Sequence, residues 1–368
     1  MPPRRRKRLD PSSFAFTPEQ VRGWGAVAES GAALARAVLV ADGRAPRVTV
    51  QISAERASVL CGVDEAIALL KTGAEDWSRL VVHALYDGDR VETAEPVLAI
   101  EGAYAEVAVL AQLCVGVLAR RTRICTNVRR LAEVARVKPV AVFPGRHDHW
   151  LAGRGDAHAA TVGGALAAQN GLFRLSGRGG PPAAVLPHSF IAAYGGATAE
   201  AARHFATGLA GVGADPATQV VVPVDYENDA VRTAVEVARA FAGPASGLEG
   251  RLWGVQIATS EYLVDRAILA EMGAFPPAGV NPALVWHVRN ALDAEGMGEV
   301  HILASGGFTV EKIRAYEEDG IPVDAFGVGA ALFAGEYDFA ADVVALEGEP
   351  QSRVGRGARV SERLERVK

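Results

Sequence analysis

Cysteine is scarce in this chain of 368 residues. Three occur, Cys61, Cys114 and Cys125, and no two of them have the CxxC spacing. This scarcity excludes a disulfide framework and a cysteine-rich zinc site, and it fits a reducing, cytoplasmic compartment.

Long apolar runs and an excess of one charge are also missing. The most apolar run, residues 105–119, is interrupted by Glu106 and Gln112 and is too short to cross a bilayer. The net charge is −5, so no general affinity for nucleic acid is implied. With 49% hydrophobic and 22% charged residues, the composition is that of a soluble globular enzyme, without membrane or nucleic-acid partners.

Residues 1–13 differ from the rest because they are strongly basic and then rich in proline and serine. They contain no apolar core, so they do not have the pattern of a secretory signal. We expect a disordered, solvated arm. Attraction of this arm to nucleic acid or to a membrane is the alternative.

Residues 14–119 mix helix and strand patterns without strict alternation, which predicts a small N-terminal α+β domain. The expected helices are 17–39 and 62–72, and the expected strands are 47–52, 77–85 and 97–100.

From residue 120 the pattern changes to repeated strand–helix units. Near-continuous apolar strands separated by helices predict a parallel sheet that is buried on both faces. The clear strands are 140–143, 220–224, 252–257, 301–304 and 323–326, and weaker candidates are 172–175 and 183–186. We therefore predict an irregular α/β barrel over residues 120–335, with an open doubly wound sheet as the alternative. Residues 336–368 form a C-terminal tail, whose polar part from Glu347 is expected to be a surface helix or disordered.

Glycines stand twice where a predicted strand gives way to a predicted helix, in Ser305-Gly306-Gly307 and in Gly327-Val328-Gly329. The first helix is expected to start after Thr309 and to end before Gly320. Two such turns on adjacent parallel strands can hold one phosphate group, as in many β/α barrels. Alternatively, these glycines only close tight turns.

Polar residues follow the other strands at the same expected end of the sheet. Arg146 follows the strand 140–143, His188 follows 183–186, and Asp225 follows 220–224. Arg146 is a candidate anion-binding residue or a surface ion-pair partner. His147 and His149 have i, i+2 spacing, but no carboxylate-plus-histidine set at metal-ligand spacing supports a transition metal there, so we expect none.

Taken together and in order, several strings make the chain resemble the nicotinate phosphoribosyltransferase family and, more distantly, the quinolinate phosphoribosyltransferases. The matching stretches are 87–102, 120–130, 143–156, 186–196, 225, 259–266, 304–313 and 322–332.

The resemblance implies an N-terminal domain beside an irregular barrel, in a homodimer. It implies transfer of a 5-phosphoribosyl group from phosphoribosyl pyrophosphate (PRPP) to the ring nitrogen of a heterocyclic acid, nicotinate, with Mg²⁺ assisting. Many members couple this transfer to ATP hydrolysis through a phosphorylated histidine, whose position His188 occupies.

The same resemblance assigns roles to individual residues. Asp225 matches an aspartate that faces the ribose or the metal, and Arg146 matches the arginine that meets the acceptor carboxylate or pyrophosphate. Other substrate-binding positions carried over from the family are Thr126, Arg130, Asp156, Ser305, Gly306, Gly307, Gly327 and Gly329.

Two departures from the family pattern fall on the strand 252–257 and its end. Where the family has an arginine this chain has Gln256, and where it has an aspartate this chain has Ala258. Ala184-Val185 also replace the usual Gly-Thr before His188. Loss of one preorganised group typically costs about 3 kcal/mol of transition-state stabilisation.

Three functions therefore remain open. The first is a nicotinate phosphoribosyltransferase of NAD biosynthesis. The second is a phosphoribosyltransferase that has changed its heterocyclic acceptor in a specialised pathway. The third is a non-catalytic homologue that binds a phosphosugar or nucleotide.

Overall fold

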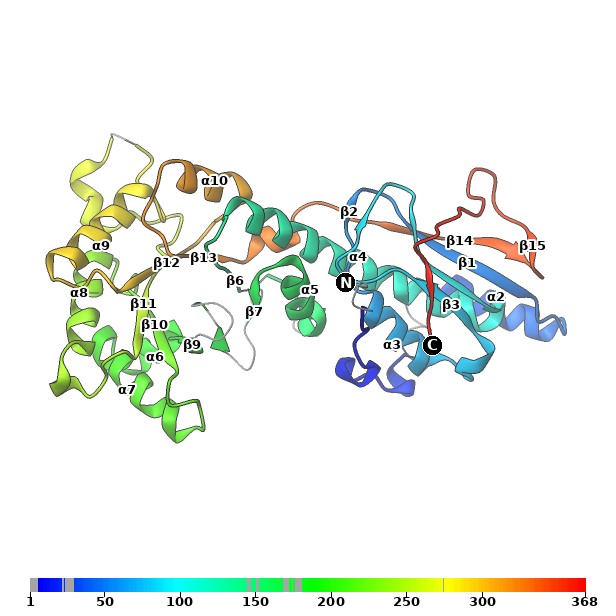
Figure 1. Ribbon diagram of the computed structural model, residues 1–368, viewed down its shortest axis with the longest axis horizontal. Helices are drawn as coiled ribbons and strands as arrows, with labels where there is room; N and C mark the ends of the chain where they lie inside the picture. The colour runs from blue at the N-terminus through cyan, green and yellow to red at the C-terminus, as the bar shows by residue number, and fades with distance from the viewer. Residues whose placement is uncertain are drawn as a thin grey trace, which may run out of the picture. The chain divides into compact units, whose positions relative to one another are not determined.

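The chain forms two compact units in a computed structural model (Figure 1). The structure describes residues 6–368 except 22, 24–29, 144–146, 150–151, 168–171, 174, 176–180 and 274. Unit 1 consists of residues 1–127, 149–163 and 333–368, and unit 2 consists of residues 128–148 and 164–332. Each unit is built on its own sheet.

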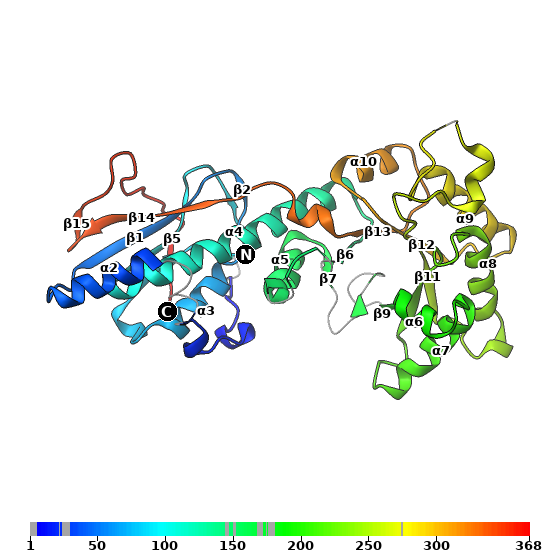
Figure 2. The same ribbon diagram turned by 180° about the vertical axis from the view of Figure 1, so that it is seen from behind.

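The sheet of unit 1 is antiparallel and has the strand order β15-β14-β1-β5-β3-β16. Its central strands are long, while β15 and β16 have two residues each. Figure 2 shows β14, from the C-terminal part of the chain, beside β1, from the N-terminal part. The strands are β1 (Arg47–Ala54), β3 (Val81–Ala84), β5 (Pro96–Ala103), β14 (Phe339–Leu346), β15 (Glu349–Pro350) and β16 (Glu365–Arg366); β2 (Ser58–Val59) and β4 (Arg90–Val91) form a separate pair.

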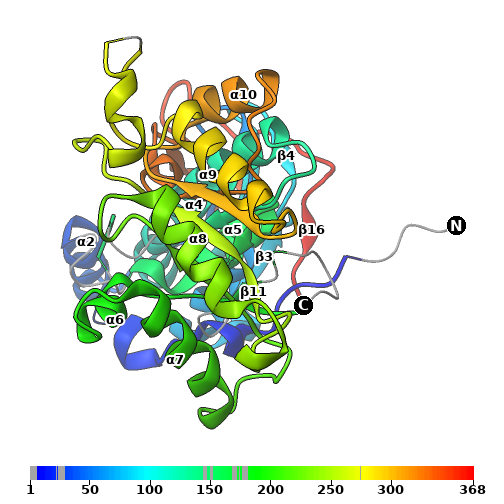
Figure 3. The ribbon, with the colours of Figure 1, turned by 90° about the vertical axis from the view of Figure 1, so that its left-hand side faces the viewer.

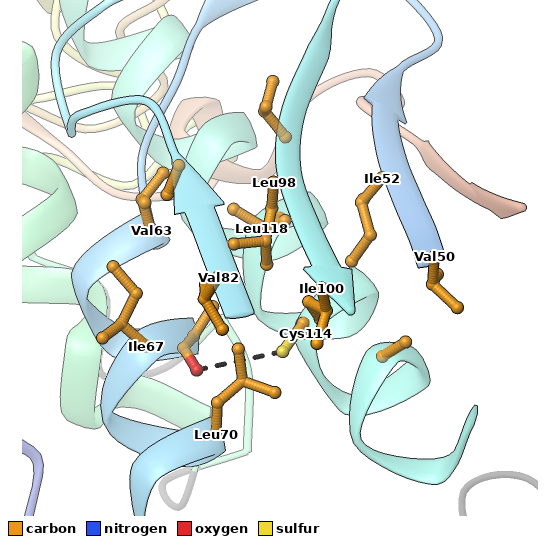
Figure 4. Packing of buried hydrophobic residues seen from close by; sticks show 14 of the residues in the cluster. Val50, Ile52, Val63, Ile67, Leu70, Val82, Leu98, Ile100, Cys114 and Leu118 are labelled. Carbon is orange, nitrogen blue, oxygen red and sulfur yellow. Dashed lines mark hydrogen bonds between the residues drawn. The ribbon is translucent and has the colours of Figure 1, made fainter. Parts of the chain in front are cut away.

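Helices cover this sheet with an apolar core between. The helical elements are η1 (Pro11–Phe14), α2 (Ser30–Ala41), α3 (Val63–Gly73), η2 (Trp77–Arg79), the first part of α4 (Tyr104–Val134), η3 (Ala152–Gly155) and α5 (Asp156–Gly163). Figure 4 shows Ile67 and Leu70 of α3 and Leu118 of α4 packed toward Leu98 and Ile100 of β5. Each fully buried side chain of this size stabilises the fold by about 1.5–3 kcal/mol.

Unit 2 contains the second sheet, with the strand order β7-β6-β13-β12-β11-β10-β9-β8. All neighbouring pairs are parallel except β8 and β9. The strands are β6 (Val140–Val142), β7 (Leu166–Ala167), β8 (Leu172–Phe173), β9 (Ala183–Val185), β10 (Gln219–Pro223), β11 (Leu252–Ile257), β12 (His301–Ser305) and β13 (Ala325–Val328).

The helices of unit 2 alternate with these strands, which explains why the sheet is parallel. Helices α8 and α9 pack on β11 and β12 (Figure 3). The elements are α6 (His188–Ala193), α7 (Thr198–Gly211), α8 (Ala230–Phe241), η4 (Pro244–Ser246), η5 (Arg266–Glu271), α9 (Pro282–Ala294), α10 (Val310–Glu318) and η6 (Ala330–Phe333).

The second sheet curls on itself, so that strands distant in its order face a common core. The ring of Phe143, which follows β6, lies 5.2 Å from the ring of Phe173 in β8. Ala141, Val221 and Leu303 belong to the same apolar cluster. This confirms the prediction of an irregular α/β barrel. In the part of the chain that the structure describes, no ladder joins β7 to β8, so the barrel is a partial one.

Three predictions about the organisation of the chain differ from the structure. The boundary at 119/120 falls inside the 31-residue helix α4, because the helical pattern continues through it. The tail 336–368 is neither helical nor a separate region, because β14 to β16 complete the sheet of unit 1. In the arm, residues 6–13 make native contacts: the Arg8 guanidinium and the Leu9 N–H donate to the Asp64 carboxylate at 3.1 and 2.8 Å.

Other predictions for single elements were close. The strand 252–257 is confirmed residue for residue, and α10 is capped by Thr309 as expected. The helix expected after Gly329 is only the short 3-10 turn η6, since β13 extends through Val328. Within the described residues, no helix has both the length and the apolar composition needed to cross a membrane.

Candidate functional site

The carboxyl ends of the parallel strands in unit 2 gather most of the predicted site residues. Pro223 of β10 pairs with Gln256 of β11, and Ser305 of β12 pairs with Gly327 of β13. Because all these strands are parallel, the residues that follow them come to one rim of the sheet. The predicted residues on or beside this rim are His188, Asp225, Gln256, Ala258, Ser305, Gly306, Gly307, Gly327 and Gly329.

His188 and Asp225 form a hydrogen-bonded pair across two neighbouring strand ends. The Nε2 atom of His188 lies 3.0 Å from Oδ1 and 3.2 Å from Oδ2 of Asp225. His188 is the first residue of α6 and its side chain is 48% exposed, while Asp225 is 14% exposed. The carboxylate orients the imidazole, and the half-exposed ring remains accessible to a ligand.

The turn after β12 has the geometry that suits an anion. Gly306 and Gly307 both have left-handed backbone angles, with φ of 97° and 65°. A Cβ added to Gly307 would meet no heavy atom within 4 Å, so the backbone there is not covered by side chains. The turn leads into the N-terminus of α10, where backbone N–H groups favour an anion.

The second glycine pair, Gly327 and Gly329, is explained by close packing of neighbouring residues. A Cβ on Gly327 would lie 2.7 Å from Cβ of Ser305 and 3.0 Å from the Phe143 ring. A Cβ on Gly329 would clash with the His147 ring and with the Phe143 carbonyl. Neither glycine has a positive φ. Close packing therefore accounts for glycine at both positions, and a phosphate-binding role for them stays a prediction.

Lys312 is a candidate that the sequence analysis missed. Its ammonium group donates to the carbonyl of Gly306 at 3.3 Å and lies 4.4 Å from the centre of the Phe308 ring. Burial lowers the pKa of Lys312, and the charge of Glu261 opposes this shift. The sequence signal that could have found it is its place in the first turn of the helix after the glycine turn.

The two altered family positions lie next to this turn. The side-chain amide of Gln256 donates to the hydroxyl of Ser305 at 2.8 Å, and both residues are buried. The carbonyl oxygens of Ala258 and Thr259 lie close to Gly306. The Thr259 hydroxyl is buried and has no hydrogen-bond partner among the described residues, so a bound group or water is needed to satisfy it.

Thr126 and Asp156 belong to unit 1. The Thr126 hydroxyl accepts a hydrogen bond from the Val59 N–H at 3.0 Å, which ties α4 to β2. Asp156 is buried and accepts hydrogen bonds from Arg120 and Arg121, and Arg121 also pairs with Glu65. Substrate binding by Thr126 and Asp156 stays a prediction.

Arg130 is exposed on the last part of α4, in unit 2, and its predicted role also stays a prediction. Arg146 lies outside the described residues. Lys138, which the sequence placed at the opposite end of its strand, pairs with Glu317 at 2.6 Å.

Comparisons of this sequence with known proteins all find similarity to phosphoribosyltransferases. Residues 34–122 match the family model described as quinolinate phosphoribosyl transferase, N-terminal domain. The chain is 28% identical over 254 residues to a nicotinate phosphoribosyltransferase of Mycobacterium tuberculosis. That match covers 68% of this chain and 49% of the mycobacterial protein, so the chain spans about half the length of this relative.

Solved structures of this kind extend the similarity over nearly the whole chain. A nicotinate-nucleotide pyrophosphorylase from Pyrococcus furiosus is 25% identical, with a TM-score of 0.69, and the match covers 97% of this chain and 82% of that one. The human nicotinic acid phosphoribosyltransferase shares the fold at 14% identity, with a TM-score of 0.59, over 96% of this chain and 77% of that one.

These matches, together with the curled, mainly parallel sheet of unit 2 and the antiparallel sheet of unit 1, make the chain similar to the type II phosphoribosyltransferases in sequence and in fold. The similarity extends to nicotinate phosphoribosyltransferases and to quinolinate phosphoribosyltransferases alike.

Proposed function

We propose that this protein transfers a 5-phosphoribosyl group from PRPP to the ring nitrogen of a heterocyclic acid, with nicotinate as the first candidate. The products would be nicotinate mononucleotide and pyrophosphate, in NAD biosynthesis. One observation carries the proposal: the His188–Asp225 pair and the Ser305-Gly306-Gly307 turn lie at the same rim of the curled parallel sheet.

The transferred group suits these residues because positive charge develops on the ribose while pyrophosphate leaves. A fixed carboxylate such as Asp225 stabilises the developing cation, since it is already in place before the reaction. The glycine turn, the start of α10 and the Lys312 ammonium form a site of positive potential that would anchor the 5′-phosphate.

Mg²⁺ would fit the same rim. Mg²⁺ is usually held by one or two carboxylates together with substrate phosphates, and Asp225 is a partly exposed carboxylate at this position. When bound, the ion would neutralise charge on the leaving pyrophosphate. The chain's own part is to hold Asp225 in place through its hydrogen bond with His188.

ATP coupling through His188 is part of the same proposal. The ring of His188 is half exposed, and its Nε2 is directed at Asp225, which supports the orientation needed for a phosphorylated imidazole. We further propose a homodimer, which sedimentation of the purified protein would detect as twice the chain mass of 38.5 kDa.

A second candidate function, transfer to a different heterocyclic acid, is favoured by the Gln256–Ser305 hydrogen bond. An arginine here would present a fixed positive charge to an anion, whereas Gln256 is neutral and its amide is directed to Ser305. With Ala258 in place of a carboxylate, this rim of the sheet has two charged side chains fewer than the family pattern.

The test is pyrophosphate release by purified protein with PRPP, Mg²⁺ and nicotinate, with and without ATP, and with product identification by mass spectrometry. Release with nicotinate supports the first candidate. Release only with quinolinate or with other pyridine or azole acids supports the second. Binding of PRPP without turnover on any acceptor would overturn both and leave a non-catalytic homologue.

A further inference from the structure

Three side chains with metal-binding atoms come together in unit 1. They are Cys61, Asp87 and His158, and one ligand atom from each lies within 4.8 Å of the other two. Within this cluster, Nε2 of His158 lies 3.0 Å from Oδ2 of Asp87. None of the three takes part in the proposed phosphoribosyl transfer.

Each side chain is fixed by local structure. Cys61 precedes α3, and its backbone N–H and carbonyl both hydrogen bond with the Thr122 hydroxyl at 3.1 Å. The other carboxylate oxygen of Asp87 accepts from the Val63 N–H, at the start of α3, at 2.7 Å. His158 lies on α5, with its ring against the edge of Phe14. The cluster is therefore held by elements that do not need a metal to be in place.

The spacing and the donor types fit zinc. With ordinary bond lengths, ligand atoms around a tetrahedral zinc ion lie about 3.3–3.6 Å apart, so the present separations require only small side-chain rotations. A thiolate, an imidazole and a carboxylate are all established zinc ligands, and the thiolate disfavours Mg²⁺ and Ca²⁺.

The burial of Cys61 argues against nucleophilic catalysis, the other chemistry that these three residue types allow. A cysteine, a histidine and an aspartate also form nucleophilic sites, but Cys61 is completely buried, so a substrate cannot reach its sulfur. An ion has an easier path, because the His158 side chain is 29% exposed. Cys125 of α4 is a further neighbour of the Cys61 sulfur.

We propose that Cys61, Asp87 and His158 bind one zinc ion, which links α3, the turn at Asp87 and α5. On binding, the Cys61 thiol loses its proton to solvent and the sulfur forms a bond to zinc, while His158 binds as the neutral imidazole. The fourth position is left for water or another donor.

The experiment uses the full-length protein, stripped with a chelator under reducing conditions and titrated with Zn²⁺ or Co²⁺. We expect one Zn²⁺ per chain by elemental analysis, and a near-ultraviolet absorption band from the thiolate–Co²⁺ bond. Cys61→Ser should abolish that band, and His158→Gln should weaken Zn²⁺ binding at least tenfold. His158 is partly exposed, so its replacement leaves no buried cavity.

Cys114→Ser is the matched control, because Cys114 is also buried in unit 1 but its sulfur donates to the Ala66 carbonyl, at 3.8 Å, and is not one of the three clustered ligands. This variant should keep the full stoichiometry and the absorption band. Failure of the wild type to bind Zn²⁺, or equal binding by the wild type and His158→Gln, would overturn the proposal. Neither result depends on transferase activity.

Discussion

At the residue scale, the paired side chains His188 and Asp225 carry the clearest functional expectation. We expect His188→Ala to abolish ATP stimulation of transfer while leaving some ATP-independent transfer, because the site for PRPP is otherwise intact. Initial rates with and without ATP measure this. His204→Ala is the control, since His204 is an exposed histidine of the same unit on α7. Unchanged ATP coupling in His188→Ala would remove the phosphohistidine role.

A second prediction concerns Lys312 and the dependence of phosphate binding on pH. Burial lowers its pKa below 10.5, so its charge is lost at a lower pH than that of an exposed lysine. The protonated form attracts phosphate, so affinity for ribose 5-phosphate should be highest below the lowered pKa and should fall as pH rises through it. Calorimetric titration between pH 7.5 and 10.5 measures this dependence.

Two variants complete this test. In Lys312→Met, binding should be about tenfold weaker or more at pH 7.5, and its dependence on pH should flatten. Lys138→Met is the control, because Lys138 pairs with Glu317 and lies at the other end of its strand. Equal affinities in Lys312→Met and the wild type would exclude phosphate contact by Lys312.

At the element scale, α4 is held to α3 and α5 by buried ions. Arg121 forms a two-bond pair with Glu65, at 2.6 and 2.9 Å, and its other nitrogen donates to Asp156 at 2.5 Å. All three side chains are buried, so removal of the cation leaves two carboxylates without full compensation.

We therefore expect Arg121→Met to lower the free energy of unfolding by about 3–5 kcal/mol, measured by urea denaturation. Arg36→Met is the control, because Arg36 pairs with Glu75 on the surface, where such pairs contribute at most about 1 kcal/mol. A loss below about 1 kcal/mol in Arg121→Met would show that the buried network is not needed for stability.

At the scale of the whole molecule, the C-terminal strands decide whether unit 1 can form. Seven of the eight residues of β14 pair with β1 in the antiparallel sheet, and Phe339 and Val344 are buried. Without β14, the edge of β1 would lose its ladder and expose apolar side chains to solvent.

Deletion of residues 337–368 should therefore leave unit 1 unfolded, as measured by limited proteolysis and circular dichroism. Deletion of residues 351–368 removes only the two-residue strand β16 and should leave a folded unit with a lower melting temperature. Equal protease resistance of the longer deletion and the intact chain would contradict the structural role of β14.

Local patterns predicted much of unit 2. The strand 252–257 and the helix that Thr309 caps were recovered because each has a continuous apolar run or a capping residue at its start. The sequence also predicted that His188, Asp225 and Ser305 lie at one rim, because the carboxyl ends of parallel strands lie at the same edge of a sheet. Unit 1 was less predictable, because its sheet joins strands from both ends of the chain.

The sequence by itself determined the alternation of strand and helix, the glycine turn before α10 and the resemblance to phosphoribosyltransferases, because these depend on residues close together in the chain. Tertiary structure decided the membership of β14 in unit 1, the packing role of Gly327, the approach of Lys312 to Gly306 and the meeting of Cys61, Asp87 and His158. The physical reason is that these residues are far apart along the chain. The spacing of the three cysteines excludes a zinc motif within one short segment. A set of ligands from three distant segments, by contrast, comes together only when the chain folds.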